Sequence, residues 1–136
     1  MFDELNVYDD TDHFFFKDGN VLSKVCNAPE RAGVYLVYQL RHGKVDLVYI
    51  GASGTINQDG TFKNQLLKGR INNTHDGIKR QALFENKIRE FDIDALDIYW
   101  YVTYDEAYND FPNELEDKLL EKHKSIYGKL PGWNKR

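Results

Sequence analysis

The chain has 136 residues, of which 41% are hydrophobic and 14% aromatic, which suits one domain with its own core and excludes a disordered tail. A single cysteine, Cys26, excludes an internal disulfide and a cysteine-based zinc site, and no apolar run reaches the length of a membrane span. The formal net charge of −4 argues against indiscriminate binding to nucleic acid, and we expect a soluble cytoplasmic protein without a membrane partner.

Residues 1–30 are expected to form a lead-in that packs on the main domain, residues 31–136. The start of this segment is acidic, whereas a secretion signal begins basic and then turns apolar. An apolar patch, Phe14–Phe16, precedes the turn signal Asp18–Asn20. Pro29 is a plausible boundary before the first regular strand of the domain.

Two strands joined by a tight turn are expected next. Residues 33–40 and 45–51 are short and rich in β-branched and aromatic residues, which is typical of buried strands. The turn between them is His42–Lys44, so the pair predicts an antiparallel hairpin. A polar, Gly-rich loop, residues 52–60, follows the second strand.

The remaining chain predicts three helices and one more strand. Helices are expected over residues 62–72, 78–90 and 112–127, the last one beginning near Pro112 and stopping at Gly128. Residues 96–103 alternate and predict the third strand. The fold class is therefore α+β, an α/β sandwich with a small three-stranded antiparallel sheet flanked by helices. The expected inward-facing helix residues are Phe62, Leu66, Leu67, Ile71, Phe84, Ile88, Phe91, Leu115, Leu119, Leu120, Ile126 and Tyr127.

Two charged residues lie where the helical pattern is apolar. Arg70 falls on the apolar face of the first helix, and Glu116 falls on that of the last helix, together with His123. An unpaired buried charge costs several kcal/mol, so a sequence keeps it when it is paired or when it holds a metal or a phosphate. The pattern alone leaves both readings open, including a purely structural ion pair between Arg70 and Glu116.

Charge is distributed unevenly along the chain. Residues 60–90 carry seven Lys or Arg and three acids, and residues 118–136 carry six and one. Between them, residues 91–117 carry nine acids and no Lys or Arg. If the basic segments meet in space, they offer a surface that follows phosphates; otherwise they are solvated helix faces.

The order of several motifs resembles that of the GIY-YIG nucleases. The tripeptides Gly33-Val34-Tyr35 and Tyr49-Ile50-Gly51 match the two motifs that name the family, with Val in place of Ile in the first. Arg70 then fits the arginine on the following helix, and Glu116 stands in the Glu-x-x-Leu-Leu setting of a later helix. Asn134, after Pro131, fits the final asparagine, so the resemblance covers residues 33–134.

The resemblance implies a DNA endonuclease that hydrolyses phosphodiester bonds with a single divalent cation. Mg²⁺ (or Mn²⁺) needs few protein ligands, and Glu116 is the expected one. Arg70 is expected to bind the scissile phosphate. We expect Tyr35 to act as the general base and Tyr49 to position the phosphate. A tyrosine suits the role of base only where nearby positive charge lowers its pKa.

Further candidates surround this set. Asn134 is expected to orient the site, and Lys44 is a candidate for lowering a tyrosine pKa. The family often has His or Tyr one helical turn after the arginine, where this chain has Thr74 and then His75, so His75 is a further candidate. Contacts with DNA are expected from the basic residues Lys63, Lys68, Lys79 and Arg80.

A homodimer or a partner protein is expected to supply target specificity, because the chain carries no separate DNA-reading domain. Three other readings stay open. The first is a binding or interaction module of the same fold that does not cleave. The second is a nucleotide-binding protein that holds phosphates at residues 51–54, although this loop lacks the usual Gly-rich spacing. The third is a plain interaction domain whose aromatics are all core.

Overall fold

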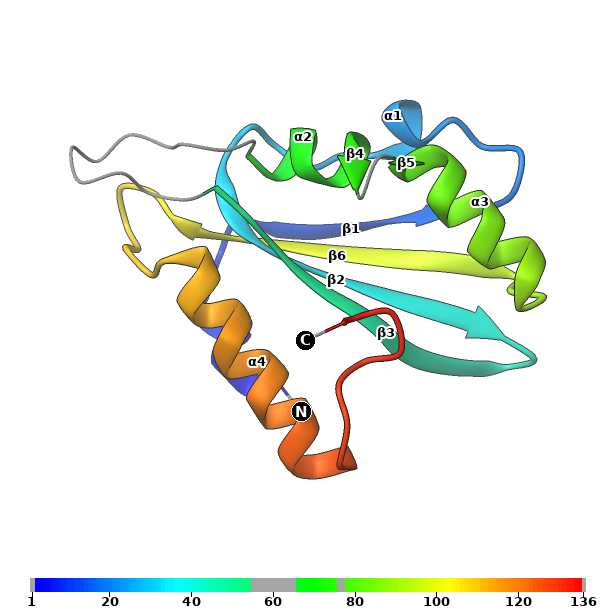
Figure 1. Ribbon diagram of the computed structural model, residues 1–136. Coiled ribbons are helices and arrows are strands. Elements are labelled where there is room, and N and C mark those ends of the chain that lie inside the picture. The colour runs from blue at the N-terminus through cyan, green and yellow to red at the C-terminus, as the bar shows by residue number, and fades with distance from the viewer. Residues whose placement is uncertain (1, 55–65, 76–77, 136) are drawn as a thin grey trace.

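A four-stranded antiparallel sheet forms the centre of the computed structural model, which describes residues 2–54, 66–75 and 78–135 (Figure 1). The strand order is β1-β6-β2-β3. Its strands are β1 (Thr11–Phe16), β2 (Ala32–Arg41), β3 (Lys44–Ser53) and β6 (Ala95–Tyr104). The short strands β4 (Thr74–His75) and β5 (Ile78–Lys79) form a separate pair. The α+β class is confirmed, but the sheet has four strands where three were expected.

Helices cover both faces of the sheet. One face carries α1 (Leu22–Val25), α2 (Leu67–Asn72) and α3 (Arg80–Glu90), and the other carries α4 (Pro112–Tyr127) (Figure 1). A short 3-10 helix, Asp3–Val7, packs on the same face as α4. None of the helices in the described ranges is long and apolar enough to cross a membrane.

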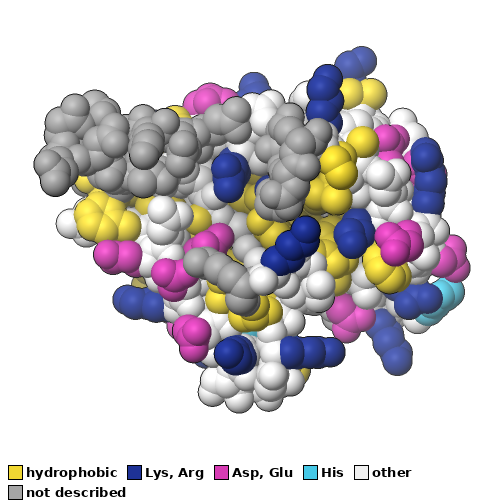
Figure 2. Space-filling model, viewed as in Figure 1, with side chains coloured by type: hydrophobic (Ala, Val, Ile, Leu, Met, Phe, Trp, Pro, Cys, Tyr) yellow, Lys and Arg dark blue, Asp and Glu magenta, His cyan; other side chains and the backbone are white. Residues whose placement is uncertain are grey.

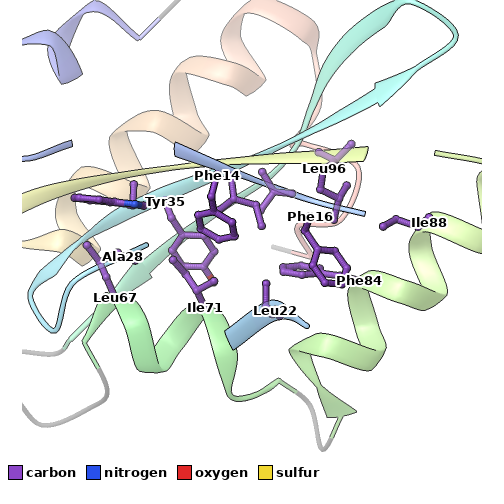
Figure 3. Close-up of a cluster of buried hydrophobic side chains, with 14 of the residues drawn as sticks. Phe14, Phe16, Leu22, Ala28, Tyr35, Leu67, Ile71, Phe84, Ile88 and Leu96 are labelled. Carbon is purple, nitrogen blue, oxygen red and sulfur yellow. The ribbon is translucent and has the colours of Figure 1, made fainter. Parts of the chain in front are cut away.

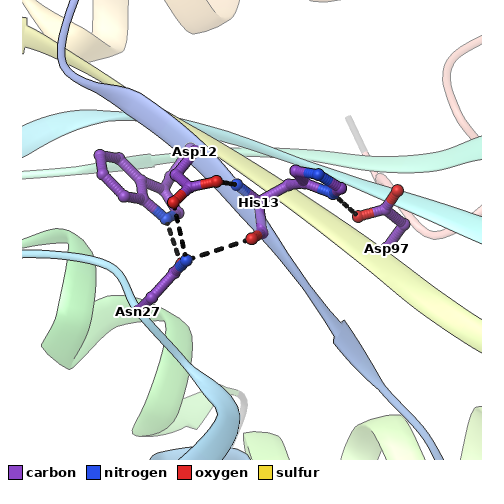
Figure 4. A network of polar contacts seen from close by, with 5 residues as sticks. Asp12, His13, Asn27 and Asp97 are labelled. Atoms are coloured by element: carbon purple, nitrogen blue, oxygen red, sulfur yellow. Dashed lines mark hydrogen bonds and ion pairs between the residues drawn. The ribbon is translucent and has the colours of Figure 1, made fainter.

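The extra strand comes from residues 1–30, the lead-in. β1 pairs along its whole length with β6, and Phe14 and Phe16 are buried in the core beneath α1 and α3 (Figure 3). Asn27 accepts a hydrogen bond from Nε1 of Trp100 at 2.7 Å and donates to Asp12 on β1 (Figure 4). The lead-in is therefore an integral part of the sheet and its core rather than a segment packed on a finished domain.

The expected hairpin is confirmed as the β2–β3 pair. Arg41 lies opposite Lys44, and the two residues between them, His42 and Gly43, have φ angles of 50° and 77°. Positive φ at both positions is the geometry of the tight turn that matches the twist of paired strands. The pairing of β2 with β3 is interrupted once along its length, where the register shifts between Val37 and Tyr38.

Alternate residues of the central strand β2 divide the core into two clusters. Tyr35 and Val37 point toward α2 and α3, whereas Val34 and Leu36 point toward α4. Helix α4 begins at Pro112 and ends where Gly128 adopts φ 77°, as expected. The side chains that α4 buries in the second cluster are Leu115, Leu119 and Leu120.

Three expected core positions are wrong. Ile126 and Tyr127 are 53% and 56% exposed, because α4 projects beyond the sheet in its last turn (Figure 1). Phe91 is 39% exposed, because α3 ends at Glu90. The expected helix over residues 62–72 is described only from Leu67, and Phe62 lies outside the described residues.

Candidate active site

A β-bulge places the two motif tyrosines on one face of the sheet. Tyr38 lies opposite Leu47 and Val37 lies opposite Tyr49, so Val48 is an extra residue in β3. Strict alternation would put Val48 and Tyr49 on opposite faces, yet both pack in the cluster under α2 and α3. The bulge thus turns Tyr49 to the face that holds Tyr35, with their ring centroids 5.9 Å apart.

The glycine of the second motif makes room for the tyrosine of the first. Tyr35 lies directly opposite Gly51, and its ring extends across the space where a side chain at residue 51 would be. A Cβ built on Gly51 would be 2.6 Å from the Tyr35 hydroxyl oxygen and in overlap with the ring carbons. The two tripeptides are therefore sterically coupled, since the position of one ring requires the absence of a side chain on the neighbouring strand.

A buried arginine completes this group, and it is Arg80 at the start of α3. Arg80 is 2% exposed, and its Nη2 donates a hydrogen bond of 3.0 Å to the Tyr35 hydroxyl. Its guanidinium carbon lies 5.9 Å from the Tyr35 ring centroid and 5.4 Å from that of Tyr49. Arg80 was expected to contact DNA; its side chain is buried between the helix and the sheet, so any such contact would have to be made from inside the pocket that it lines.

The surroundings of Tyr35 do not suit a general base. Burial raises the pKa of its hydroxyl well above the usual value, and the nearby charges of Arg80 and Arg70 offset this only in part. The side chain is 0% exposed, so no solvent reaches it. Tyr35 accepts the hydrogen bond of Arg80, and the half-buried Tyr49 is the tyrosine that borders open space, so this geometry favours Tyr49 rather than Tyr35 for contact with a substrate.

The other two expected cations, Arg70 and Lys44, are exposed and differ in how near they lie to the tyrosines. Arg70 is exposed, although it is near enough to Tyr35 to influence the pKa of that hydroxyl. Leu67 and Ile71 form the buried stripe of α2, and because the described helix begins at Leu67, Arg70 falls on its flank rather than at its apolar centre. Lys44 is exposed at the other end of β3, five residues from Tyr49, or about 16 Å along an extended strand. It is too distant to affect either motif tyrosine.

Glu116 is half-buried in the second turn of α4, on the helix that covers the opposite face of the sheet. It borders the buried stripe of Leu115, Leu119 and Leu120, whereas Glu114 and Asp117 are exposed, as expected. The described geometry does not place Glu116 beside the tyrosines and Arg80. Helix α4 covers one face of the sheet, and α3, which carries Arg80, covers the other (Figure 1).

The C-terminal tail covers this same edge. The backbone N–H of Trp133 donates to the Val48 carbonyl at 2.8 Å. The Asn134 amide bonds Ile50 twice, accepting from its N–H at 3.0 Å and donating to its carbonyl at 2.9 Å. Asn134 thus replaces a partner strand beside the second motif and fixes β3, which agrees with a positioning role.

Two of the other expected DNA contacts have described side chains. Lys68 and Lys79 are exposed on the side of the sheet that carries α2 and α3. Lys63 lies outside the described residues, and of His75 the structure describes only that it belongs to β4. The lysines of α4 lie on the helix of the opposite face. Within the described parts of the two basic segments, the tail brings Lys135 to Arg80 and Lys87 of α3.

A pocket opens where Tyr49 and Arg80 meet α3 and the tail. It encloses about 150 Å³, and its lining combines three cations with aromatic and aliphatic side chains. Figure 2 shows Lys and Arg side chains next to a hydrophobic patch in the middle of this face, with acidic side chains farther out. The lining residues are Tyr49, Ile78, Arg80, Leu83, Lys87, Trp133 and Lys135.

Sequence reasoning named Arg80 as a DNA contact but missed its burial against the tyrosines, and it missed the pocket. A signal for Arg80 was available, because Arg80, Phe84 and Ile88 follow each other at four-residue intervals, which puts the arginine on the buried stripe of α3. The pocket had no such signal, since Lys87 and Trp133 are distant in the chain and only the tail's path along β3 joins them.

The residues present fit a hard cation only in a limited way. Glu116 offers carboxylate oxygens and is partly exposed, which suits Mg²⁺ or Mn²⁺. Among the described residues, no three His, Cys, Asp or Glu side chains come together. A cation at Glu116 would therefore be held by few protein ligands and would keep several of its waters.

The phosphate-binding loop considered from the sequence is not supported by the geometry. Residues 51–53 belong to β3 and are buried, and the Tyr35 ring lies against Gly51. The Ser53 hydroxyl is bonded to the backbone of Gly33, accepting from its N–H at 3.0 Å. No space remains there for a nucleotide phosphate.

Comparison of the chain with models of protein families, with curated proteins and with solved structures finds no match. The resemblance to the GIY-YIG nucleases accordingly depends on the sequence motifs of the chain and stays a prediction.

Proposed function

We propose that this chain is a divalent-metal-dependent DNA endonuclease of the GIY-YIG kind that hydrolyses phosphodiester bonds. The observation that supports this most is the coupling of the two tripeptides. A bulge, a glycine without which the Tyr35 ring would not fit, and a buried arginine together bring Tyr35 and Tyr49 to one face. Such strand irregularities are concentrated beside active sites, where they re-aim a side chain.

In this proposal, each residue of the group has a role set by its exposure. Arg80 is a fixed positive charge, and a permanently charged planar group suits stabilisation of a phosphoryl transition state. Arg70, exposed and near Tyr35, binds the phosphate on approach. Tyr49 faces the substrate and holds the attacking water or the phosphate by its hydroxyl.

Three further residues complete the site. Tyr35 fixes Arg80 by accepting its hydrogen bond, and Asn134 fixes β3. The cation, Mg²⁺ or Mn²⁺ held by Glu116, supplies a Lewis acid and an acidified water when bound.

The test is cleavage of a supercoiled plasmid with Mg²⁺ or Mn²⁺, compared with EDTA. Glu116→Gln is compared with Glu114→Gln, which changes an exposed carboxylate on the same helix. Metal-dependent nicking that is lost in Glu116→Gln and kept in Glu114→Gln supports the proposal. Equal cleavage by the two variants would remove Glu116 from the site.

One observation favours a second candidate, a DNA-binding or interaction module that does not cleave. Glu116 is on the helix of the opposite face, and the most deeply placed tyrosine is fully buried. This candidate predicts DNA binding whose affinity is the same with Mg²⁺ and with EDTA, and no nicking under any metal or salt condition.

Partners are proposed on the same basis. A homodimer with one site per chain would cut both strands of a duplex. Linear product that appears without accumulated nicked circles, at protein concentrations where the chain sediments as a dimer, would support this. Nicked circles as the sole product would favour a monomer or a partner protein that supplies specificity.

A further inference from the structure

The pocket beside Tyr49 and Arg80 has a lining that a phosphate alone does not explain. Its walls include Ile78, Leu83 and the ring of Trp133, which offer apolar and aromatic surface. A phosphate alone would make no favourable contact with the apolar part of this lining. A purely apolar ligand would leave the cations of the pocket without a partner of opposite charge. The combination suits a ligand with a flat ring and an attached anionic group.

The cations are arranged so that the anionic group has a defined end. Arg80, 2% exposed, forms the inner end of the pocket, and the exposed Lys135 belongs to its rim. The ammonium of Lys87 lies 5.6 Å from the centroid of the Trp133 ring and 5.4 Å from that of Phe91. Aromatic rings hold this lysine at the pocket by cation–π attraction.

The size of the pocket matches one ring. A protein cavity of about 150 Å³ is known to accept benzene, and this pocket encloses about that volume. A pyrimidine base has one six-membered ring, and the phosphate of the same nucleotide would then be beside Arg80 and Tyr49. Trp133 is itself fixed, because its backbone N–H donates to the Val48 carbonyl and its ring packs near that of Phe84, with ring centroids 6.4 Å apart.

We propose that this pocket binds one unpaired base of a nucleic-acid substrate, next to the phosphate that the site holds. The proposal rests on the proposed function and narrows its substrate class. A base inside a duplex is stacked on both faces, so it enters such a pocket only when it is flipped out or already unpaired. The preferred substrates are therefore DNA with a bulge, mismatch, flap or single-stranded end, rather than an intact duplex.

The experiment measures binding of the full chain, with EDTA present to prevent cleavage, to three DNA duplexes. One carries a single bulged thymine, the second carries an abasic residue at the bulge, and the third is fully paired. Stacking of a base on aromatic side chains contributes about 1–3 kcal/mol, so the thymine bulge should bind about 5- to 150-fold more tightly than the abasic bulge. The tryptophan fluorescence should change when the thymine bulge binds, and the change should come from Trp133. The other tryptophan, Trp100, is 5% exposed and does not line the pocket.

Two variants separate this effect from general DNA binding. Trp133→Ala should bind the thymine and abasic bulges with equal affinity, because the aromatic wall that stacks on the base is removed. Lys124→Ala, an exposed change on α4, should keep the preference. Equal binding of the two bulges by the wild-type chain, or a preference kept by Trp133→Ala, would overturn the base pocket.

The failures of the two proposals are distinguishable. Plasmid nicking without any preference for the thymine bulge leaves the nuclease standing and removes the pocket's role. Absence of both nicking and DNA binding removes the proposed function and the base pocket with it.

Discussion

At the scale of single residues, the packing of one ring determines the character of the candidate site. Tyr35 reaches over Gly51 to meet Arg80, and each of the three needs the other two. The buried guanidinium keeps a hydrogen bond and two aromatic neighbours, which offsets part of the cost of removing its charge from water. Changes at these residues should therefore alter stability as well as activity.

Gly51→Ala should destabilise the fold by about 1–3 kcal/mol, because the new Cβ overlaps the Tyr35 ring. In an open strand the same change would stabilise by up to about 1 kcal/mol, so the sign of the effect is diagnostic. Urea unfolding measures it. Gly132→Ala is the matched control, since a Cβ there meets nothing within 4 Å, and an equal loss in both variants would contradict the account.

Tyr35→Phe should cost about 1.5–3 kcal/mol of folding free energy, the range for a hydrogen bond to a charged group. In a double-mutant cycle with Arg80→Met, the two losses should be smaller together than their sum, because both changes remove the same bond. Additive losses would show that the two residues act independently. A general base, by contrast, would lose activity in Tyr35→Phe while stability stayed at the wild-type level.

The residue types of the site could be predicted from the sequence, but their roles could not. The order of motifs directed attention to Tyr35, Tyr49 and Asn134, which lie on the same pair of strands and their edge. The burial of Arg80 follows from its four-residue spacing with Phe84 and Ile88. Arg70 falls on the flank because α2 begins at Leu67, so its buried stripe is Leu67 and Ile71 alone.

At the scale of secondary-structure elements, the two edges of the sheet are treated differently. β3 is covered by the tail through Trp133 and Asn134, which protects the strand that carries the second motif. β1 forms the other edge and contributes Phe14 and Phe16 to the core. The site is thus next to a covered edge. The lead-in forms the opposite edge of the sheet and packs in the same core cluster as the tyrosines.

Phe16→Ala should destabilise the chain by about 3–5 kcal/mol, because this side chain is 0% exposed beneath α3. Phe15→Ala is the control, since Phe15 on the same strand is 47% exposed and should lose less than about 1 kcal/mol. Thermal or urea unfolding distinguishes them. Similar small losses in both would mean that residues 1–30 are a dispensable lead-in after all.

Strand β1 was missed because its sequence shows neither the β-branched run of residues 33–40 and 45–51 nor the alternation of residues 96–103. Phe14–Phe16 is a run of three aromatics, and only the structure shows that the middle one points outward. The β2–β3 hairpin was predictable because its turn and its β-branched strands agree. The bulge at Val48 was not, since it depends on how the tail and β2 pair with the strand.

At the scale of the whole molecule, the helices on both faces of the sheet bury tyrosines. This burial makes the free energy of unfolding depend on pH in the alkaline range. Burial raises the pKa of Tyr38 to about 12, and that of Tyr35 is raised further by the same cause. A group whose pKa is raised on folding stabilises the fold below its unfolded pKa, about 10, and loses this contribution as pH rises toward the folded value.

Folding stability should therefore fall as the pH is raised from about 9 to about 11, since the unfolded tyrosines then ionise while the folded ones do not. Urea midpoints across this range measure the decline. Tyr38→Phe should make the decline shallower, because one contributing hydroxyl is removed. A stability profile that is flat over this interval, or identical in Tyr38→Phe, would contradict the assignment.

The placement of Glu116 belongs to this scale as well. Its helical neighbours predicted a position on the apolar face of the last helix, but the face of the sheet that α4 covers depends on how the chain crosses from β6 to the helix. That crossing is a property of the assembled fold. The sequence resemblance put Glu116 and the tyrosines in one site, and in the fold Glu116 belongs to the helix that covers the face of the sheet opposite to the tyrosines.

The measurement that tests the account most directly is the rate at which Tyr49→Phe cleaves labelled DNA under single-turnover conditions with Mg²⁺. The account predicts a loss of about 10²- to 10³-fold with stability near that of the wild type, because one hydrogen bond to the transition state contributes about this much. Tyr101→Phe, half-buried on the other face, should cleave at the wild-type rate. Cleavage by Tyr49→Phe at the wild-type rate, or no cleavage by the wild-type chain, would contradict the account.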